Sequence, residues 1–188
     1  MKVTELELPG VLLIEPRVFR DERGSFMESW SARRFAEAGL EVEFVQDNVS
    51  WSRQGVIRGL HYQHPGGQAK LTSVLRGEVW DVVVDIRRGS PTFGRWTGVT
   101  LSEENGRQLF IPEGYAHGFA ASSGDAIFSY KCSRDYNPRC EWTIRWDDPE
   151  LGIDWPVAEP VVSCKDQNGR RLSELPSEAL PAMLQGGV

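Results

Sequence analysis

The chain has 188 residues, of which 40% are hydrophobic and 26% charged, and this composition predicts one globular domain spanning residues 1–188. The net charge of −6 excludes the basic balance of a general nucleic-acid-binding protein, and no apolar run approaches the roughly 18 residues of a membrane span. Three cysteines without a C-x-x-C pair, and a start (MKVTELELPG) without a signal-peptide core, predict a cytoplasmic protein with reduced thiols.

Short strands dominate the predicted secondary structure. They are rich in Val, Ile, Phe, Trp and Thr, and Gly, Pro, Asn or Asp separates them. In chain order we expect strands at 11–15, 42–46, 56–63, 71–77, 78–87, 96–102, 107–111, 115–122, 125–133 and 141–146. Residues 76–78 and 122–125 are expected to form hairpin turns. Many short strands at close spacing indicate an all-β protein with a closed barrel or a double sheet.

Two short helices are expected beside the strands. The first covers residues 32–38, because Ser31 is a good N-cap and Gly39 favours a C-terminal stop. The second covers residues 177–184, although Pro181 is unfavourable inside a helix. Both would be peripheral, so the predicted fold class remains all-β.

Two histidine segments carry the first functional signal. GRQLFIPEGYAH, from Gly106 to His117, has the form G-x5-P-x-G-x2-H, and GVIRGLHYQ places His61 two residues before Gln63. Together they resemble the two signature segments of the cupin superfamily, which implies a cupin-type jelly-roll barrel. Metal-binding cupins have an H-x-H pair followed by a glutamate, but here Gln63 takes the second histidine position and no glutamate follows before Gly77.

Neither a metal site nor a phosphate loop fits the first histidine segment well. The charged residues between Gln63 and Gly77 are Lys70 and Arg76, and an ammonium group repels a divalent metal, so we expect no metal here. Strand alternation should point His64 to the opposite face from His61. HPGGQAKLT lacks the G-x4-G-K-[ST] spacing of a phosphate loop, so its glycines are expected only to make a turn between two strands.

If His61 and Lys70 face a cavity, the chemistry available to them is proton transfer beside an electrophilic oxygen. Histidine is the usual general base near neutral pH and needs a carboxylate to fix its tautomer, while lysine can stabilise a developing oxyanion or enolate. Strict alternation sends His61 and Gln63 to one face and Arg58 and Tyr62 to the other, unless a bulge intervenes. The spacing alone therefore does not place Arg58 beside His61.

Longer segments make the resemblance more specific. They are RDERGSFMESW (20–30), FVQDNVSWSRQGVIRGLHYQ (44–63), QAKLTSVLRGEVWDVVVDIRRGSPTFGRW (68–96), QLFIPEGYAHGF (108–119), YNPRCE (136–141) and SCKDQ (163–167). In this order, over most of the chain, they resemble the dTDP-4-dehydrorhamnose 3,5-epimerase family. The resemblance implies a homodimeric, metal- and cofactor-free jelly roll that acts on the dTDP-4-keto-6-deoxysugar dTDP-4-keto-6-deoxyglucose.

The same resemblance implies the catalytic roles. His61 would be the base, Asp166 its dyad partner, Tyr130 the acid on the opposite face of the sugar, and Lys70 the cation that holds the C4 oxygen as it becomes an enolate. The C4 ketone acidifies the protons on both neighbouring carbons, so one pocket can invert C3 and C5. Each inversion needs one group to remove a proton and a different group to deliver one to the other face.

The substrate-binding residues are also implied by the resemblance. They would be Arg23, Phe26, Glu28, Gln46, Asn48, Arg58 and His117, with Tyr136, Glu141 and Lys165 lining the same pocket. Arginine suits a diphosphate through paired hydrogen bonds, and Phe26 would stack on thymine. The segment RGSFMESW is expected to complete the site of the neighbouring subunit in a dimer.

Some residues depart from the family pattern. Tyr115 stands where phenylalanine is common, Cys164 stands where glutamate is common, and the paired prolines usual near Gly66 and Gly67 are missing. These departures leave open an epimerase that inverts only C3 or only C5, in antibiotic-sugar biosynthesis.

Two other classes of protein remain as alternatives. One is a metal-dependent cupin enzyme that uses His61, His64 and His117. The other is a cupin that binds a nucleotide sugar without catalysis. Taken singly, His117 and Tyr130 are also compatible with core positions, and Asp166 with an ordinary turn.

Overall fold

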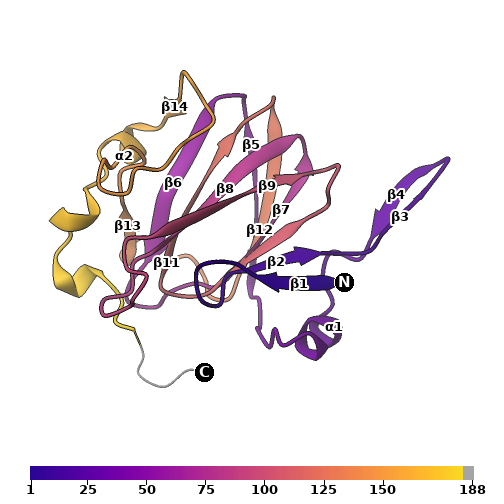
Figure 1. The fold of residues 1–188 in the computed structure, drawn as a ribbon, viewed down its shortest axis with the longest axis horizontal. Helices are drawn as coiled ribbons and strands as arrows, with labels where there is room; N and C mark the ends of the chain where they lie inside the picture. Colours follow the sequence, from indigo (N-terminus) through magenta and orange to yellow (C-terminus); the bar gives the residue numbers. More distant parts are fainter. Residues whose placement is uncertain (184–188) are drawn as a thin grey trace.

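Two sheets that face each other form the body of the protein (Figure 1), a computed structural model that describes residues 1–183. The first, here called the β7 sheet, has the order β1 (Lys2–Glu5), β2 (Leu12–Glu15), β10 (Gln108–Ile111), β7 (Lys70–Arg76), β12 (Ala126–Cys132) and β5 (Gln46–Ser52). The second, the β6 sheet, has the order β13 (Glu141–Thr143), β6 (Val56–Gln63), β11 (Tyr115–Ala121), β8 (Glu78–Asp85) and β9 (Trp96–Ser102). The pairs are antiparallel, except that β14 (Val161–Val162) joins β6 in parallel. The all-β expectation is confirmed.

Several connections carry the chain from one sheet to the other. β6 and β7 lie in different sheets, as do β7 and β8, and β11 and β12. The expectation of hairpin turns at 76–78 and 122–125 is therefore wrong, because each of these tight turns joins facing sheets instead of paired strands. The loop that holds Gly66 and Gly67 does connect two strands, as expected, and it also crosses between the sheets.

The N-terminal part differs most from the prediction. Strand β1 was not expected, and neither was the hairpin of β3 (Val18–Asp21) and β4 (Gly24–Met27), which projects from the barrel in Figure 1. The strand expected at 42–46 is wrong, because β5 begins only at Gln46. Val42 and Phe44 instead pack with Trp30 against the outer face of the β7 sheet. Their apolar alternation comes from covering this face and not from pairing as a strand.

The first expected helix is confirmed and the second is wrong. Helix α1 (Ala32–Glu37) has Ser31 as its N-cap, and Gly39 follows it with a φ of 89°. Within the expected helix at 177–184 the described residues contain only the 3-10 turn η2 (Ser177–Ala179), and residue 184 lies outside them. Pro181 has no N–H to continue an α-helix. Two elements were not expected, α2 (Cys164–Gln167) and the 3-10 turn η1 (Leu172–Glu174).

Three apolar clusters hold the layers together. One fills the space between the sheets and includes Val83, Leu109 and Phe128. The second joins the outer face of the β6 sheet to the C-terminal segment, and the third joins the outer face of the β7 sheet to α1. Buried polar residues also lie between the sheets, which marks that region as the candidate site.

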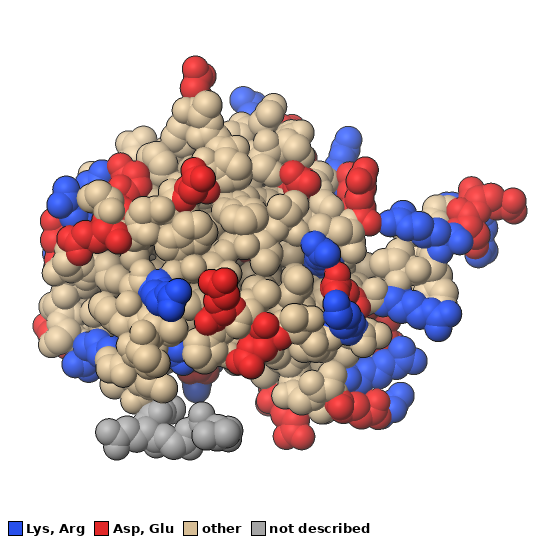
Figure 2. All heavy atoms as spheres, viewed as in Figure 1, with Lys and Arg blue, Asp and Glu red and all other residues tan. Residues whose placement is uncertain are grey.

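Charges of both signs are interspersed over the face shown in Figure 2, and they also gather at the tip of the β3–β4 hairpin. No helix among the described residues has the length and hydrophobicity needed to cross a membrane.

Candidate active site

Two cavities of about 270 and 510 Å³ share His61, Lys70 and Tyr130 in their walls. The smaller cavity also contains four of the predicted binding residues, namely Gln46, Asn48, Tyr136 and Glu141. The larger one contains Arg58, His117, Lys165 and Asp166. The structure thus brings together all of the predicted site residues except Arg23, Phe26 and Glu28.

His61 and Asp166 form a hydrogen-bonded pair. Nε2 of His61, on β6, lies 2.6 Å from Oδ1 of Asp166, on α2, and Oδ2 accepts the backbone N–H of Gly59 at 3.3 Å. Burial by itself would raise the pKa of Asp166, but hydrogen bonds from His61, Gly59 and Ser163 hold it below its ordinary value. An ionised carboxylate can only accept, so Nε2 carries the ring proton and Nδ1 is the free basic nitrogen.

A β-bulge brings Arg58 into the same cavity as His61. Between the pairs His117–His61 and Phe119–Arg58, β6 advances three residues while β11 advances two. Strict alternation therefore fails here, and Arg58 lines the larger cavity beside His61. Its guanidinium donates to Ser52 Oγ at 3.0 Å and to the Trp51 carbonyl at 3.2 Å, which fixes its orientation.

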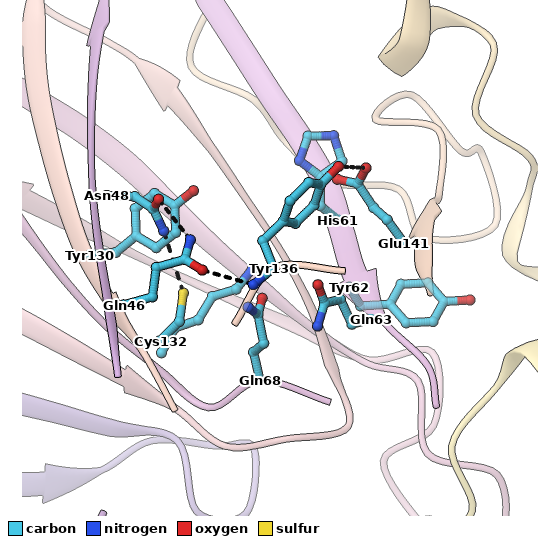
Figure 3. A pocket seen from close by; sticks show the side chains of 11 residues that line it. Gln46, Asn48, His61, Tyr62, Gln63, Gln68, Tyr130, Cys132, Tyr136 and Glu141 are labelled. Atoms are coloured by element: carbon cyan, nitrogen blue, oxygen red, sulfur yellow. Dashed lines mark hydrogen bonds between the residues drawn. The ribbon is translucent and has the colours of Figure 1, made fainter. Parts of the chain in front are cut away.

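Tyr130 faces the cavity from the other sheet. It lies on β12 of the β7 sheet, whereas His61 lies on β6 of the β6 sheet. In Figure 3, Tyr130 is on one side of the pocket with Asn48 and Cys132, and His61 is on the other. Burial raises the pKa of Tyr130, so its hydroxyl is protonated at neutral pH and can act as an acid.

Lys70 places its amine in the walls of both cavities. Its amine lies 5.9 Å from the centre of the Tyr130 ring, and among residues 1–183 no carboxylate forms an ion pair with it. Burial lowers the pKa of Lys70, while the nearby groups Cys132, Asp81 and Glu141 act in the opposite direction. A buried ammonium without a partner favours an oxyanion placed beside it.

A second histidine–carboxylate pair lies between the sheets. His117 Nε2 is 2.5 Å from Oδ1 of Asp81, and Oδ2 of Asp81 accepts from Thr72 Oγ1 at 2.7 Å. Burial lowers the pKa of His117, which favours its neutral form. The sequence reasoning missed Asp81, although an aspartate inside the otherwise apolar run VWDVVV was a usable signal.

The rim of the smaller cavity is a hydrogen-bonded network. Glu141 accepts from Tyr136 Oη at 2.7 Å and forms an ion pair of 2.5 Å with Lys165. Gln46 accepts the backbone N–H of Tyr136 at 2.7 Å and donates to Asn48 at 2.9 Å. Burial would raise the pKa of Glu141, but the hydrogen bonds from Lys165 and Tyr136 hold it below its ordinary value.

The residues that first suggested a metal motif have other roles in the structure. Gln63 joins two loops, since its amide oxygen accepts the N–H of Asn137 at 2.7 Å and its nitrogen donates to the Gly66 carbonyl at 3.2 Å. His64 lines neither cavity, and its carbonyl accepts from Trp142. In residues 1–183 no three His, Cys, Asp or Glu side chains are grouped to hold a metal ion.

Three predicted binding residues lie away from both cavities. Arg23 and Phe26 are on the β3–β4 hairpin with highly exposed side chains, and Arg23 pairs with Asp21. Glu28 follows β4 and pairs with Arg34 of α1 at 3.3 Å. These residues therefore belong to a separate surface of the same chain.

The residues that depart from the family pattern lie outside the cavity walls. Tyr115 is buried among apolar residues, and its hydroxyl donates to the Pro9 carbonyl at 2.6 Å. Cys164 is exposed at the first position of α2. Neither residue lines either cavity.

Comparison with known proteins finds relatives along nearly the whole chain. The family profile described as dTDP-4-dehydrorhamnose 3,5-epimerase matches residues 5–174. A Methanothermobacter thermautotrophicus protein of that name is 54% identical over 172 residues, which are 90% of this chain and 93% of the relative.

Solved structures resemble this one closely. The dTDP-6-deoxy-D-glucose-3,5-epimerase from Legionella pneumophila, in complex with dTDP-4-keto-L-rhamnose, has a TM-score of 0.94 at 50% identity and covers 97% of this chain and 98% of its own. A 3′-monoepimerase from Streptomyces bikiniensis, in complex with dTDP-quinovose, has a TM-score of 0.88 at 38% identity and covers 94% and 91%. The family resemblance and the cupin-type barrel expected from the sequence are confirmed.

Proposed function

The chain belongs to the dTDP-4-dehydrorhamnose 3,5-epimerase family, and from this premise we propose which of its residues invert the sugar. The enzyme is an isomerase that inverts C3 and C5 of dTDP-4-dehydro-6-deoxy-D-glucose to give dTDP-4-dehydro-L-rhamnose. The observation that carries the residue assignment is the position of His61 and Tyr130 on facing sheets, with Lys70 in the wall of the same cavities.

His61 is the base in this proposal. Its Nδ1 takes the proton from a carbon next to the C4 ketone, and the electron pair of the broken C–H bond moves into the carbonyl to give an enolate. Asp166 keeps the ring proton on Nε2 and stabilises the imidazolium that forms, as the carboxylate does in hydrolase triads. The 2.6 Å contact between the two side chains supports these roles.

Lys70 and Tyr130 complete each inversion. The Lys70 ammonium stabilises the enolate oxygen, and the Tyr130 hydroxyl delivers a proton to the opposite face of the carbon. His61 is then an imidazolium and Tyr130 a phenolate, so proton exchange with solvent must restore both before the second carbon reacts. The same sequence at C3 and C5 gives the double epimerisation without a metal or a cofactor.

The nucleotide and diphosphate bind around this centre. Arg58 is held in the larger cavity in a suitable position for a phosphate oxygen. Gln46, Asn48, Tyr136, Glu141 and Lys165 form the polar rim. His117, held by Asp81, lines the larger cavity below the sugar.

A homodimer would bring the remaining binding residues into use. Phe19 and Phe26 are exposed on the projecting hairpin, and Val49, Trp51 and Leu75 are exposed on the outer side of the β7 sheet. Exposed apolar groups of this kind favour association. In the proposed dimer each hairpin reaches the partner's cavity, where Arg23 contacts the diphosphate, Phe26 stacks on thymine, and Glu28 binds the nucleotide.

Two features of the whole chain remain predictions. A single domain is supported by the two sheets, which take strands from residue 2 to residue 162. A cytoplasmic location is consistent with the three cysteines, which are all free.

Solvent exchange tests the proposed function. We expect purified enzyme in D₂O to introduce deuterium at both C3 and C5 of dTDP-4-keto-6-deoxyglucose, detected by NMR. Deuterium at C3 alone or C5 alone would indicate a monoepimerase, and no exchange at either carbon would indicate a binding protein. Activity that chelators abolish and a divalent metal restores would indicate the metal-dependent alternative.

A further inference from the structure

The helix that carries Asp166 has an unusual cap. Ser163-Cys164-Lys165-Asp166 has the S-x-x-D spacing of a capping box, in which the acid at the third helical position normally bonds back to the N–H of the capping residue. Here Ser163 Oγ accepts the N–H of Asp166 at 3.1 Å, which is the forward half of the box. The carboxylate instead bonds to His61 and Gly59, so the return half is missing.

Ser163 is also the joint between two elements. β14 pairs with β6 through Val161 and Val162 and ends directly before Ser163, and α2 begins directly after it. Helix α2 has only 4 residues, too few to be stable by itself. The position of Asp166 therefore depends on how this joint fixes the helix against β6.

The Ser163 hydroxyl has a second use beyond the cap. Its oxygen accepts from the Asp166 N–H, which leaves the hydroxyl proton free to donate. That hydroxyl is among the groups that lower the pKa of Asp166, after His61 and Gly59. It thus supports both the backbone and the charge of the same residue.

We infer that Ser163 is a positioning residue for the catalytic base, acting through Asp166 on the tautomer and orientation of His61. The inference rests on the roles proposed for His61 and Asp166. Without the hydroxyl, Asp166 loses its cap, and the His61 ring proton is no longer held on Nε2. The fraction of enzyme with a basic Nδ1 then falls, while Gln46, Asn48 and Arg58, which lie on strands, stay in place.

The test compares Ser163→Ala with Ser163→Thr. Threonine keeps the hydroxyl and is also a good N-cap, and residue 163 is exposed in the wall of the larger cavity, so there is room for the extra methyl group. We expect Ser163→Ala to lower kcat about fivefold, with KM changed less than twofold. A fivefold change corresponds to the free energy that the loss of an N-cap typically costs a helix. Ser163→Thr should restore most of the rate.

A readout that needs no turnover separates this inference from the proposed function. The chain has 3 histidines, so ¹⁵N NMR can resolve the tautomer of His61. We expect the Nε2–H tautomer in the wild type and in Ser163→Thr, and a mixture of tautomers in Ser163→Ala. An unchanged tautomer and unchanged kcat in Ser163→Ala would overturn the inference, whereas an inactive wild type with the expected tautomers would overturn the proposed function alone.

Ser31→Ala is the matched control. It removes an N-cap of the same kind from α1, which lines neither cavity. We expect it to lower thermal stability while leaving kcat and the His61 tautomer unchanged. If Ser31→Ala lowered kcat as much as Ser163→Ala does, the effect would be one of general stability and the positioning role would be wrong.

Discussion

Gly59 and Gly118 touch across β6 and β11, so closely that a Cβ on Gly59 would lie 2.6 Å from the Cα of Gly118. Gly59 is in the bulge that brings Arg58 to the His61 side, and its N–H bonds to Asp166. The close contact of two glycines therefore holds three site residues in place together.

Gly59→Ala tests this contact. The added methyl meets backbone atoms that no rotamer change can move, so we expect the free energy of unfolding to fall by about 3 kcal/mol and turnover to be lost. Gly124→Ala is the control, because Gly124 also has a positive φ, of 150°, but nothing lies within 4 Å of its added Cβ. It should cost only about 1 kcal/mol by urea denaturation and keep full activity. Equal effects of the two variants would show that backbone strain, not the contact, is responsible.

Loss of either dyad member should abolish turnover. We expect His61→Ala and Asp166→Ala to lower kcat by about 10³-fold or more, because the base or its correct tautomer is lost. Nucleotide binding should stay nearly intact, which titration calorimetry with dTDP can measure. A His61→Ala enzyme with a near-normal rate would exclude His61 as the base.

Tyr130→Phe should separate exchange from inversion. His61 can still remove and return a proton on its own face, so deuterium should still enter the substrate from D₂O. Inversion should fall by about 10² to 10⁴-fold, because no acid remains on the other face. NMR of the recovered sugar measures both quantities, and an equal loss of exchange and inversion would contradict the separate roles.

Lys70→Met should make the protein more stable and less active. Since burial lowers the pKa of Lys70, the folded state binds the proton less tightly than the unfolded state does. The ammonium therefore costs stability at pH values below the folded pKa, and this cost disappears as the pH rises above the unfolded pKa. We expect a gain of about 1 to 2 kcal/mol near pH 7 that shrinks at alkaline pH, with kcat reduced by about 10²-fold or more. A destabilised Lys70→Met protein would show that the cation has partners in the folded state.

Mixing two inactive variants tests the exchange of hairpins between subunits. A dimer of one His61→Ala subunit and one Arg23→Ala subunit has one site with an intact base and an intact hairpin. After dissociation and random reassociation we expect about a quarter of the wild-type rate, measured against each variant alone. No recovery, with mixed dimers present in native mass spectra, would mean that each hairpin serves its own subunit.

The sequence was sufficient for the central strands and for most of the candidate site, because the family motifs span both. His61, Lys70, Tyr130 and Asp166 meet as expected, although 105 residues separate His61 from Asp166. Turn residues were read correctly as turns, but local turn chemistry does not specify whether the next strand pairs with the previous one or crosses to the facing sheet. For that reason both expected hairpins were wrong.

Other features depend on contacts that alternation does not encode. The bulge in β6 follows from the approach of Gly59 to β11, which strand patterning cannot reveal. The role of Asp81 depends on its neighbour His117 from another strand. Among residues 1–183 the β3–β4 hairpin pairs only with itself, and its charged turn lacks the apolar alternation from which strands are recognised.

Because Asp166 lies late in the sequence, on α2, activity requires a chain that extends at least through this helix. A chain cut short before α2 would still contain every central strand of both sheets and most of the cavity wall, yet His61 would have no carboxylate. Such a fragment would also expose the outer face of the β6 sheet, which Leu172, Leu175 and Leu180 cover in the full chain. Fragments left by interrupted synthesis or by proteolysis would therefore be inactive. Only chains that extend through α2 would catalyse the epimerisation.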